Sequence, residues 1–408
     1  MDVISYILSK NRGDYQRDNF DSFLKKVKFE FDIHAIHITG TNGKGSTAYF
    51  LKDIYTKNGY KVGLFTSPDE LQEMIKIGDI CCEIAYIESV IDEYKKLIEK
   101  YDLSTFEIET FIALKYFLDN KVDIAIIECG MGGEFDATNI FTPALSIITS
   151  ISIEHSEFLG VSLSEVAAHK SGIIKRDVPV LIGDVEGDAL NVVVSKAKKE
   201  NSPIVMVDKY HNYSFDNGSV FDYRPYYGLK INSGAKYRVY DACLAVEATN
   251  ILKEQFPVKE DLLKEGLLVS KLKCRFEVVD YKPLIVLDGA HNPHGINKLR
   301  EEFDACYPRR NVQIIFASFR DKNISLMLPE ISLIGKVHLT TFDNGRARTE
   351  NEYFLYLEDY DYSNDYKSLI DKYIAENPDD ILLITGSLTF TYVVRDYLNA
   401  LSFSKSNS

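Results

Sequence analysis

Several signals of a secreted or membrane-bound protein are missing from this sequence of 408 residues. Its six cysteines include no CxxC pair, so a disulfide-stapled class is excluded and we expect reduced thiols in the core. No run of eighteen apolar residues occurs, and the first twenty residues contain no basic patch followed by an apolar core. Neither a membrane span nor a signal peptide is therefore predicted, and we expect a cytoplasmic protein.

An excess of basic residues is missing as well. The chain has 47 Lys and Arg against 61 Asp and Glu, so its formal net charge is 47 − 61 = −14. A surface of this sign repels phosphate backbones and anionic bilayers, so we expect no nucleic-acid or membrane partner. With 45% hydrophobic and 26% charged residues, the composition is that of a globular protein. At roughly 150 residues per domain, the length predicts two to three domains.

The sequence pattern predicts an α/β fold. Short β-branched runs alternate with longer helical stretches, which is typical of βαβ units and a mainly parallel sheet. A first series of buried strands is predicted at 33–39, 61–65, 122–128, 144–150 and 178–182, and a second series at 284–287, 312–317, 336–341 and 381–385. A short polar stretch at 280–283 sets the predicted boundary, which gives domains 1–281 and 282–408. A hairpin or loop excursion is predicted at 211–232.

The strongest local motif is HITGTNGKGSTAYF, in which a predicted strand is followed by glycines and then by a helix. Glycines allow backbone N–H groups to point at phosphates, Lys44 supplies a positive charge, and the Ser46 hydroxyl can bind Mg²⁺. A strict GxxxxGK[ST] pattern does not match, because Gly45 separates Lys44 from Ser46. The alternative is a glycine-rich turn with an incidental lysine. The predicted phosphate-binding residues are Gly40, Thr41, Asn42, Gly43, Lys44, Gly45, Ser46 and Thr47.

A second glycine cluster, IIECGMGGEFDATN, follows a predicted strand that ends at Glu128. A GxGxxG dinucleotide motif would need glycine at position 135, where Phe135 stands. An acid at the carboxyl end of a strand faces the ligand crevice of an open α/β sheet, where it can bind magnesium. Glu128 is therefore a candidate ligand, and a solvated carboxylate at a strand end is the alternative.

Two further segments contain residues with catalytic chemistry. His155 follows a predicted strand, and Lys170 lies fifteen residues later in a predicted helix. Composition alone favours a structural histidine and a solvated lysine. In LDGAHNPHG, Asp288 ends a strand, and His291 and Asn292 lie where a ligand at a domain interface would bind. A well-capped turn before a helix is the alternative for this segment.

The motifs GTNGKGS, TSP, GMGG with FDATN, SI-EH, HKSGI, RFE, LDGAHNP and TGSL occur in this order between residues 37 and 390. Together they resemble the Mur ligase superfamily and, within it, the folylpolyglutamate synthase and dihydrofolate synthase family. The resemblance implies a P-loop-type ATP-binding α/β domain and a smaller, Rossmann-like carboxyl-terminal domain, with the active site in a cleft between them. It also implies that a carboxylate attacks the γ-phosphate of ATP and that L-glutamate captures the acyl phosphate, which releases ADP and phosphate.

The resemblance assigns residues to the first metal ion and the phosphates. Gly43, Lys44 and Ser46 match residues that hold phosphates and a first Mg²⁺. Ser67 and Glu128 match residues close to that ion.

The remaining assignments concern a second Mg²⁺ and the carboxyl-terminal domain. His155 matches a ligand of that ion, and Lys170 matches a lysine that the family carbamylates to make an oxygen ligand, which reverses the reading from composition. Arg275 matches an arginine that reaches the ATP phosphates. Asp288 matches a ribose or nucleotide contact, and His291 matches a residue near the phosphates and the incoming glutamate.

The chain also departs from the family pattern at positions expected to recognise substrates. The family has HL directly after TSP, and it has PGR where this chain reads KCR. It also has an arginine within GLGGRLDATN and an HQxxNA motif that is expected to touch adenine. The corresponding residues here include Asp69, Cys274, Glu134, Arg238 and Asp241. Pterin contacts and nucleotide preference are therefore expected to differ.

The leading hypothesis is an ATP-dependent amide ligase that adds L-glutamate to folate, to dihydropteroate or to both, with polyglutamate extension preferred. A Mur-like ligase acting on a different carboxylate is the nearest alternative. A P-loop phosphotransferase would use Lys44 and Ser46 but not Lys170. A nucleotide-binding protein that has lost catalysis is the third alternative. We expect a monomer whose partners are these small molecules.

Overall fold

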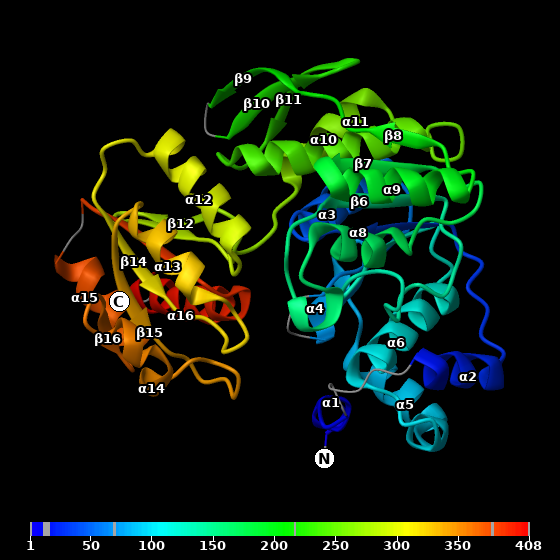
Figure 1. The fold of residues 1–408 in the computed structure, drawn as a ribbon, viewed down its shortest axis with the longest axis horizontal. Helices are drawn as coiled ribbons and strands as arrows, with labels where there is room; N and C mark the ends of the chain where they lie inside the picture. Colours follow the sequence, from blue (N-terminus) through cyan, green and yellow to red (C-terminus); the bar gives the residue numbers. More distant parts are fainter. Residues whose placement is uncertain (1, 11–16, 68–70, 216–217, 377–378, 407–408) are drawn as a thin grey trace. The chain divides into compact units, whose positions relative to one another are not determined.

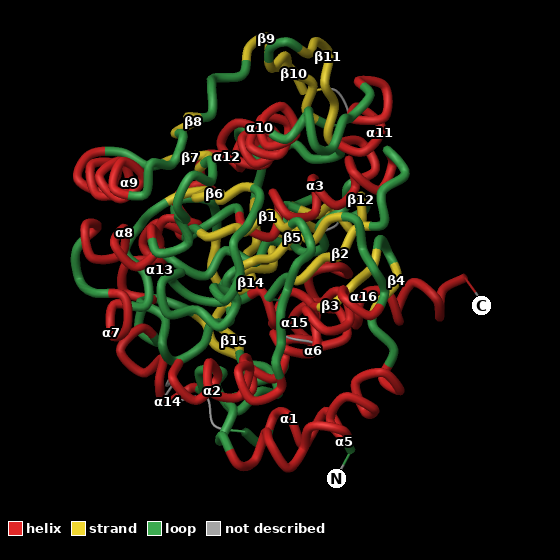
Figure 2. Tube along the Cα trace, turned by 90° about the vertical axis from the view of Figure 1, so that its right-hand side faces the viewer, coloured by secondary structure: helices red, strands yellow, loops and turns green. Residues whose placement is uncertain are grey.

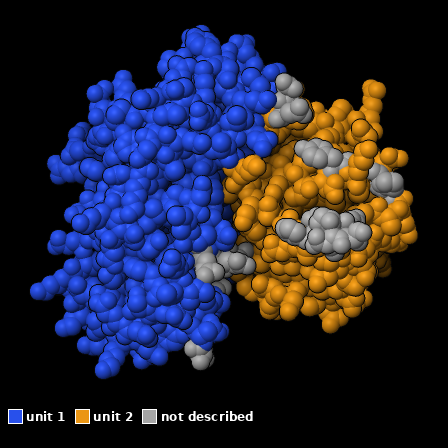
Figure 3. Space-filling model, turned by 180° about the vertical axis from the view of Figure 1, so that it is seen from behind, with its two compact units in different colours: residues 1–214, 220–232, 238–270 blue, residues 215–219, 233–237, 271–408 orange. Residues whose placement is uncertain are grey.

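The computed structural model describes residues 2–10, 17–67, 71–215, 218–376 and 379–406. The chain packs into two compact units (Figure 3). Unit 1 comprises Met1–Ser214, Val220–Asn232 and Arg238–Ser270, and unit 2 comprises Phe215–Ser219, Ser233–Tyr237 and Lys271–Ser408. No helix in the described part of the chain is long and apolar enough to cross a membrane. All six cysteines are free thiols.

The described residues of unit 1 form an eight-stranded sheet with the order β4-β3-β2-β5-β1-β6-β7-β8. Figure 1 labels β6, β7 and β8 of this sheet. Its strands are β1 (Ala35–Thr39), β2 (Val62–Phe65), β3 (Ile75–Ile77), β4 (Ile80–Cys81), β5 (Ile124–Glu128), β6 (Leu145–Ser150), β7 (Val180–Asp184) and β8 (Ile204–Met206). Strands β2, β5, β1, β6, β7 and β8 are parallel to one another. Strands β3 and β4 add an antiparallel edge next to β2. All five strands predicted for the first series are confirmed.

Helices cover both faces of this sheet, which is why its central strands β1, β5 and β6 are buried along their whole length. Ile36 and Ile38 of β1 enter a core with α3 and α10, whereas Ala35 enters a second core with α2, α5 and α6. Figure 2 shows strands of this sheet between α3 on one side and α6 on the other. The helices of unit 1 are α1 (Val3–Leu8), α2 (Arg17–Val27), α3 (Lys44–Lys57), α4 (Leu71–Met74), α5 (Ile84–Lys100), α6 (Thr105–Asp119), α7 (Ser156–Leu159), α8 (Leu163–Ser171), α9 (Gly187–Lys199), α10 (Lys236–Ile251) and α11 (Glu260–Val269).

The predicted excursion at 211–232 is a small antiparallel sheet. It consists of β9 (His211–Phe215), β10 (Ser219–Tyr223) and β11 (Tyr226–Ile231), in the order β11-β10-β9. Phe221, Tyr223 and Leu229 are buried in the core that α3, α10 and α11 also line. This sheet therefore has no core of its own among the described residues, in agreement with the prediction.

Unit 2 contains a six-stranded sheet with the order β12-β13-β17-β14-β15-β16. Its strands are β12 (Glu277–Tyr281), β13 (Leu284–Leu287), β14 (Val312–Phe316), β15 (Lys336–Thr340), β16 (Asp361–Ser363) and β17 (Ile381–Thr385). Only β12 runs antiparallel to its neighbour, and the four strands predicted for the second series are confirmed. Contacts assign 271–281 to unit 2, whereas the predicted boundary lies between 281 and 282. The functional division into 1–281 and 282–408 stays a prediction.

Helices pack on both faces of the second sheet too. Helices α12 and α13 share one core with β14 and β15, and α15 and α16 share another with β13 and β17. The helical segments are α12 (Pro293–Cys306), α13 (Ile324–Ser332), α14 (Glu350–Tyr353), the 3₁₀ turn η1 (Phe354–Tyr356), α15 (Tyr366–Glu376) and α16 (Leu388–Ser406). Both units are therefore α/β layers built on mainly parallel sheets, as predicted.

Candidate active site

The predicted phosphate loop, residues 40–43, connects β1 to α3 and leaves no room for side chains at two positions. Gly40 and Gly43 have φ of 153° and 90°. A Cβ at Gly40 would overlap Thr149 Oγ1, and a Cβ at Gly43 would overlap Asp241 Oδ1. Left-handed backbone is strained for L residues, so both steric space and conformation require glycine here. Such a backbone cradle fits a phosphate group.

Strand β6 and the residues after it hold this loop in place. Thr41 N–H donates to Ser150 O at 2.8 Å, and Asn42 N–H donates to Ser150 Oγ at 3.0 Å. The Thr149 hydroxyl donates to Asn42 O at 2.6 Å, and the Thr41 hydroxyl donates to Ser152 O at 3.1 Å. Sequence reasoning missed Thr149 and Ser150, because hydroxyl groups more than 100 residues away give no local signal.

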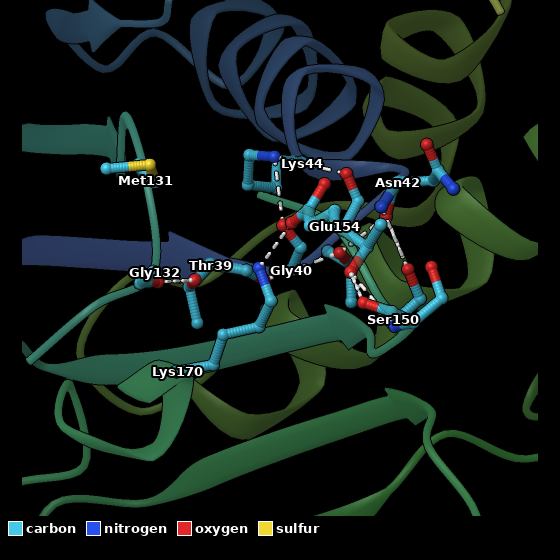
Figure 4. Close-up of polar contacts among 12 residues, drawn as sticks. Thr39, Gly40, Asn42, Lys44, Met131, Gly132, Ser150, Glu154 and Lys170 are labelled. Carbon is cyan, nitrogen blue, oxygen red and sulfur yellow. Dashed lines mark hydrogen bonds and ion pairs between the residues drawn. The ribbon is translucent and has the colours of Figure 1, made fainter. Parts of the chain in front are cut away.

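The first turn of α3 presents a positive end to this cradle. Lys44 Nζ folds back and donates to Gly40 O at 2.9 Å and to Thr41 O at 3.2 Å (Figure 4). Ser46 and Thr47 are buried in this turn, and the Thr47 hydroxyl has no hydrogen-bond partner in the part of the chain that is described. The first N–H groups of a helix also lack partners within the helix. The turn can therefore bind an anion, provided Lys44 rotates toward it.

Glu128 faces the same turn from the end of β5. Its buried carboxylate accepts a hydrogen bond from Ser67 N–H at 3.4 Å. Glu128 Oε2 also lies 3.4 Å from the position of a Cβ at Gly45, the second residue of α3. Mg²⁺ in nucleotide sites is bound by one or two carboxylates together with hydroxyl, water and phosphate oxygens. The Glu128 carboxylate beside the Ser46 turn fits that donor set.

Lys170 is buried at the end of α8 and forms an ion pair with Glu154. Its side chain is 1% exposed, and Nζ donates to Glu154 Oε1 at 2.8 Å (Figure 4). Burial lowers the pKa of Lys170, Glu154 opposes this shift, and the charge of Lys44 adds to it. Burial raises the pKa of Glu154, but the charges of Lys170 and Lys44 outweigh it and lower this pKa to about 2. Glu154 is therefore ionised at neutral pH.

His155 follows Glu154 directly and is exposed at the start of α7. Its φ is 45°, and its charge is close enough to Glu154 to help lower the pKa of that carboxyl. Glu154 is thus the chain neighbour of one predicted ligand of a second metal ion, His155, and the ion-pair partner of the other, Lys170. The motif SI-EH contains Glu154 without assigning it a role, and the buried ion pair with Lys170 is the observation that gives it one.

In unit 2 the predicted residues gather at the carboxyl end of β13. Asp288 is 4% exposed, and its carboxylate accepts hydrogen bonds from the Tyr237 hydroxyl at 2.7 Å, Phe276 N–H at 2.8 Å and Ala290 N–H at 2.9 Å. Burial raises the pKa of Asp288, and the charge of Arg275 opposes this shift. Asp288 therefore shapes the turn that carries its neighbours.

This turn determines which ring nitrogen of His291 carries the proton. Its Nδ1 lies 2.8 Å from Gly289 O, an oxygen that can only accept a hydrogen bond. Nδ1 consequently carries the proton, and Nε2 is the basic nitrogen when the ring is neutral.

The residues that depart from the family pattern are mostly buried. Arg238 is 3% exposed, and its guanidinium lies 5.2 Å from the centroid of the Phe50 ring. Burial raises the pKa of the Cys274 thiol to about 12, which keeps it protonated. Glu134 donates its backbone N–H to His169 O at 2.8 Å. Asp69 lies outside the described residues.

Comparison with known proteins identifies relatives along most of the chain. Residues 38–233 match the Mur ligase middle domain, and residues 274–388 match the Mur ligase, glutamate ligase domain. A dihydrofolate synthase/folylpolyglutamate synthase of Buchnera aphidicola subsp. Baizongia pistaciae is 30% identical over 388 residues, which cover 91% of this chain and 90% of that protein. The protein of the same description from Bacillus subtilis is 29% identical over 402 residues, covering 90% of this chain and 91% of the relative.

Solved structures agree with the sequence relatives. An FPGS-AMPPCP-folate complex matches with a TM-score of 0.85 and 26% identity, and the match covers 98% of this chain and 100% of that one. The two Mur ligase domains thus follow one another along one α/β chain, and the relatives match that chain over most of its length. The chain belongs to the dihydrofolate synthase/folylpolyglutamate synthase family of Mur ligases.

Proposed function

We propose that the chain is an ATP-dependent ligase that joins the amine of L-glutamate to the carboxylate of a folate or a dihydropteroate and releases ADP and phosphate. Extension of folates is the preferred activity. The observation that carries the proposal is the buried Lys170–Glu154 pair beside a phosphate cradle. A phosphotransferase needs the cradle but has no use for Lys170. A relative with this fold binds AMPPCP and folate, which supports the same substrates here.

In this proposal the loop 40–43 and the first turn of α3 bind the ATP phosphates. Their backbone N–H groups point at the anion, and Lys44 exchanges its two carbonyl partners for phosphate oxygens. This exchange costs two hydrogen bonds, but an ammonium paired with phosphate forms stronger, charge-assisted ones. Phosphoryl transfer depends mainly on such positioning and charge.

Two magnesium ions complete the proposed site and supply Lewis-acid stabilisation of the phosphate charge when bound. Ser46, Ser67 and Glu128 would hold the first ion. His155 and Lys170 would hold the second, with Lys170 carbamylated. Carbamylation needs the neutral amine, and the burial that lowers the pKa of Lys170 favours that form. A carbamate beside the ionised Glu154 would place two anions together, which a divalent cation can neutralise.

Unit 2 contributes the remaining proposed residues. Arg275 would offset negative charge on the phosphates, and Asp288 would contact the nucleotide while it shapes the turn. His291 would present Nε2 to the reacting groups, because Nδ1 is held by Gly289 O. We propose further that the protein works as a monomer in the cytoplasm.

The first experiment is to measure ADP release with Mg-ATP and L-glutamate in the presence of tetrahydrofolate, dihydropteroate or no acceptor. The expected result is acceptor-dependent ADP and a product heavier by one glutamyl residue. The acceptor that gains this mass decides between the two synthase activities. ADP that needs no amino acid would identify a phosphotransferase, and no ADP with either pterin would identify a different carboxylate or a lost activity.

The metal assignment has its own test in the variant Lys170→Ala. We expect turnover to be abolished and to be restored in part by short-chain carboxylic acids, which replace the missing oxygen ligand. Lys198→Ala removes an exposed lysine from α9 and serves as the matched control. Full activity of Lys170→Ala would exclude the carbamate.

A further inference from the structure

The loop between β5 and β6, residues 130–139, is closed on itself around one buried carboxylate. Asp136 accepts hydrogen bonds from Met131 N–H at 2.8 Å, from Thr138 N–H at 3.0 Å and from the Thr138 hydroxyl at 2.5 Å. The Thr138 hydroxyl also lies 2.8 Å from His37 Nε2 of β1. Since the hydroxyl donates to Asp136, His37 Nε2 is the donor in this contact. The loop is therefore tied together and anchored to the sheet.

One side of this loop caps α8, the helix that carries Lys170. Glu134 N–H donates to His169 O at 2.8 Å, and Asn139 Nδ2 donates to Gly172 O at 3.1 Å. His169 O also accepts from Gly172 N–H at 3.2 Å, so the loop adds a second hydrogen bond to this carbonyl group and a further one to the C-cap residue, Gly172.

The loop and the end of α8 are in close contact, with no room for an added side chain at Gly133 or Gly172. A Cβ at Gly133 would lie 2.9 Å from the carbonyl oxygens of both His169 and Lys170. A Cβ at Gly172 would overlap the backbone of Glu134. Any displacement of the loop is therefore passed to the final turn of α8, because close-packed groups do not deform independently.

The other side of the loop is held by Arg17, the first residue of α2. Its Nη1 donates to Glu134 O at 3.0 Å and to Asp136 O at 3.3 Å, and its Nη2 donates to Asn139 O at 2.7 Å. A guanidinium has five donors in a rigid plane, so it can bridge three carbonyl groups that a single ammonium cannot span. Arg17 thus fixes the segment that caps α8.

We infer that Arg17 is a positioning residue for Lys170, acting through the loop 130–139. It binds the carbonyl groups of Glu134 and Asn139, and these residues hold the end of α8 on which the Lys170 side chain reaches Glu154. Metal ligands need placement within about 0.5 Å, so loosening this connection weakens the second metal site. The inference rests on the proposed function where it treats Lys170 as a metal ligand.

The test is the variant Arg17→Lys, which keeps the positive charge but loses the planar fork. We expect faster hydrogen–deuterium exchange of the backbone of residues 163–174. We also expect the free Mg²⁺ concentration for half-maximal turnover to rise about tenfold or more, the usual effect of losing a group that supports a ligand. The KM for L-glutamate should stay unchanged. In Arg17→Ala, added guanidinium ion should bring the free Mg²⁺ concentration for half-maximal turnover part of the way back to the wild-type value.

Asp21→Asn is the matched control. Asp21 touches Arg17 Nε at 3.4 Å from the same helix, so this variant removes the ion pair and leaves the carbonyl contacts intact. It should behave as the wild type in both measurements. Unchanged exchange or an unchanged Mg²⁺ response in Arg17→Lys would overturn the inference. If the wild type forms no glutamyl product, the proposed function fails, and the exchange of 163–174 alone decides whether Arg17 fixes α8.

Discussion

His37 is a fully buried histidine whose protonation opposes folding. Burial lowers its pKa to about 3, and the charges of Lys175 and Arg17 contribute. Its Nδ1 has no hydrogen-bond partner among the described residues. The unfolded chain, with a histidine pKa of about 6.5, binds this proton more readily than the folded one, so folding stability rises with pH between about 3 and 6.5. Above pH 6.5 the effect vanishes.

The variant His37→Gln measures this penalty. Between pH 7.5 and pH 5, His37 should cost the wild type about 2 kcal/mol of unfolding free energy. Over the same pH interval, the unfolding free energy of His37→Gln should fall by about 2 kcal/mol less than that of the wild type, whatever its stability at pH 7.5. Urea unfolding curves at the two pH values give the comparison. An equal loss in both proteins would mean that His37 is not buried and neutral.

Asp241 places a carboxylate against the phosphate loop, where the family pattern has an uncharged amide. It is 6% exposed, and its Oδ1 fills the space next to Gly43. A like charge beside a triphosphate weakens binding, so Asp241→Asn should lower the Kd for an ATP analogue by a factor on the order of ten. Asp92→Asn, which removes an exposed charge from α5, is the control. Unchanged affinity in titration calorimetry would contradict the prediction.

At the scale of single residues, the sequence predicts those whose role follows from a local motif. Lys44 and Glu128 were predicted because a glycine-rich turn and a strand end position them. Arg17 and Glu154 receive no role from the sequence, because the partners of Arg17 are backbone carbonyl groups more than 100 residues away and the motif SI-EH does not reveal that Glu154 pairs with Lys170. Backbone acceptors have no signature in a sequence.

At the scale of elements, the two ends of α3 offer a comparison between two glycines, Gly43 before the helix and Gly59 after it. Gly43 and Gly59 have φ of 90° and 89°, so alanine at either position incurs the same left-handed strain, about 1 kcal/mol. They differ in space, since a Cβ at Gly43 meets Asp241 whereas nothing lies within 4 Å of one at Gly59. Gly43→Ala should therefore abolish binding of an ATP analogue, and Gly59→Ala should lose only stability. Comparable binding by both variants would show that the cradle has room.

The elements that sequence patterns predicted are those that are long enough or buried on both faces. All nine predicted strands are present, and their continuous apolar runs reflect helices on both sides of the sheets. The strands β3, β4, β8 and β16 have two or three residues each, too few for any period to appear. Strand β12 forms a hairpin with β13 across a short turn, and its last two residues lie in the polar stretch 280–283 that sets the predicted domain boundary.

At the scale of the whole molecule, each hydrophobic core draws its buried residues from one unit only. Proteins built in this way often depart from two-state unfolding. We therefore expect two calorimetric transitions, of which a nonhydrolysable ATP analogue with Mg²⁺ raises at least the one that belongs to unit 1. At one hundred times its Kd, a ligand adds about 2.7 kcal/mol to the unit that binds it. A single transition in all conditions would show that the units unfold together.

The hydrogen bonds between Lys44 and its own loop bear on turnover. Its ammonium donates to Gly40 O and Thr41 O, and these two hydrogen bonds stabilise the loop. In the proposed site, a nucleotide competes with these two carbonyl groups for Lys44, and a product with fewer phosphates competes less well. When ADP is left in the loop, the return of Lys44 to its carbonyl partners favours departure of the product, and the rate of that step is set by how strongly the loop binds its own lysine.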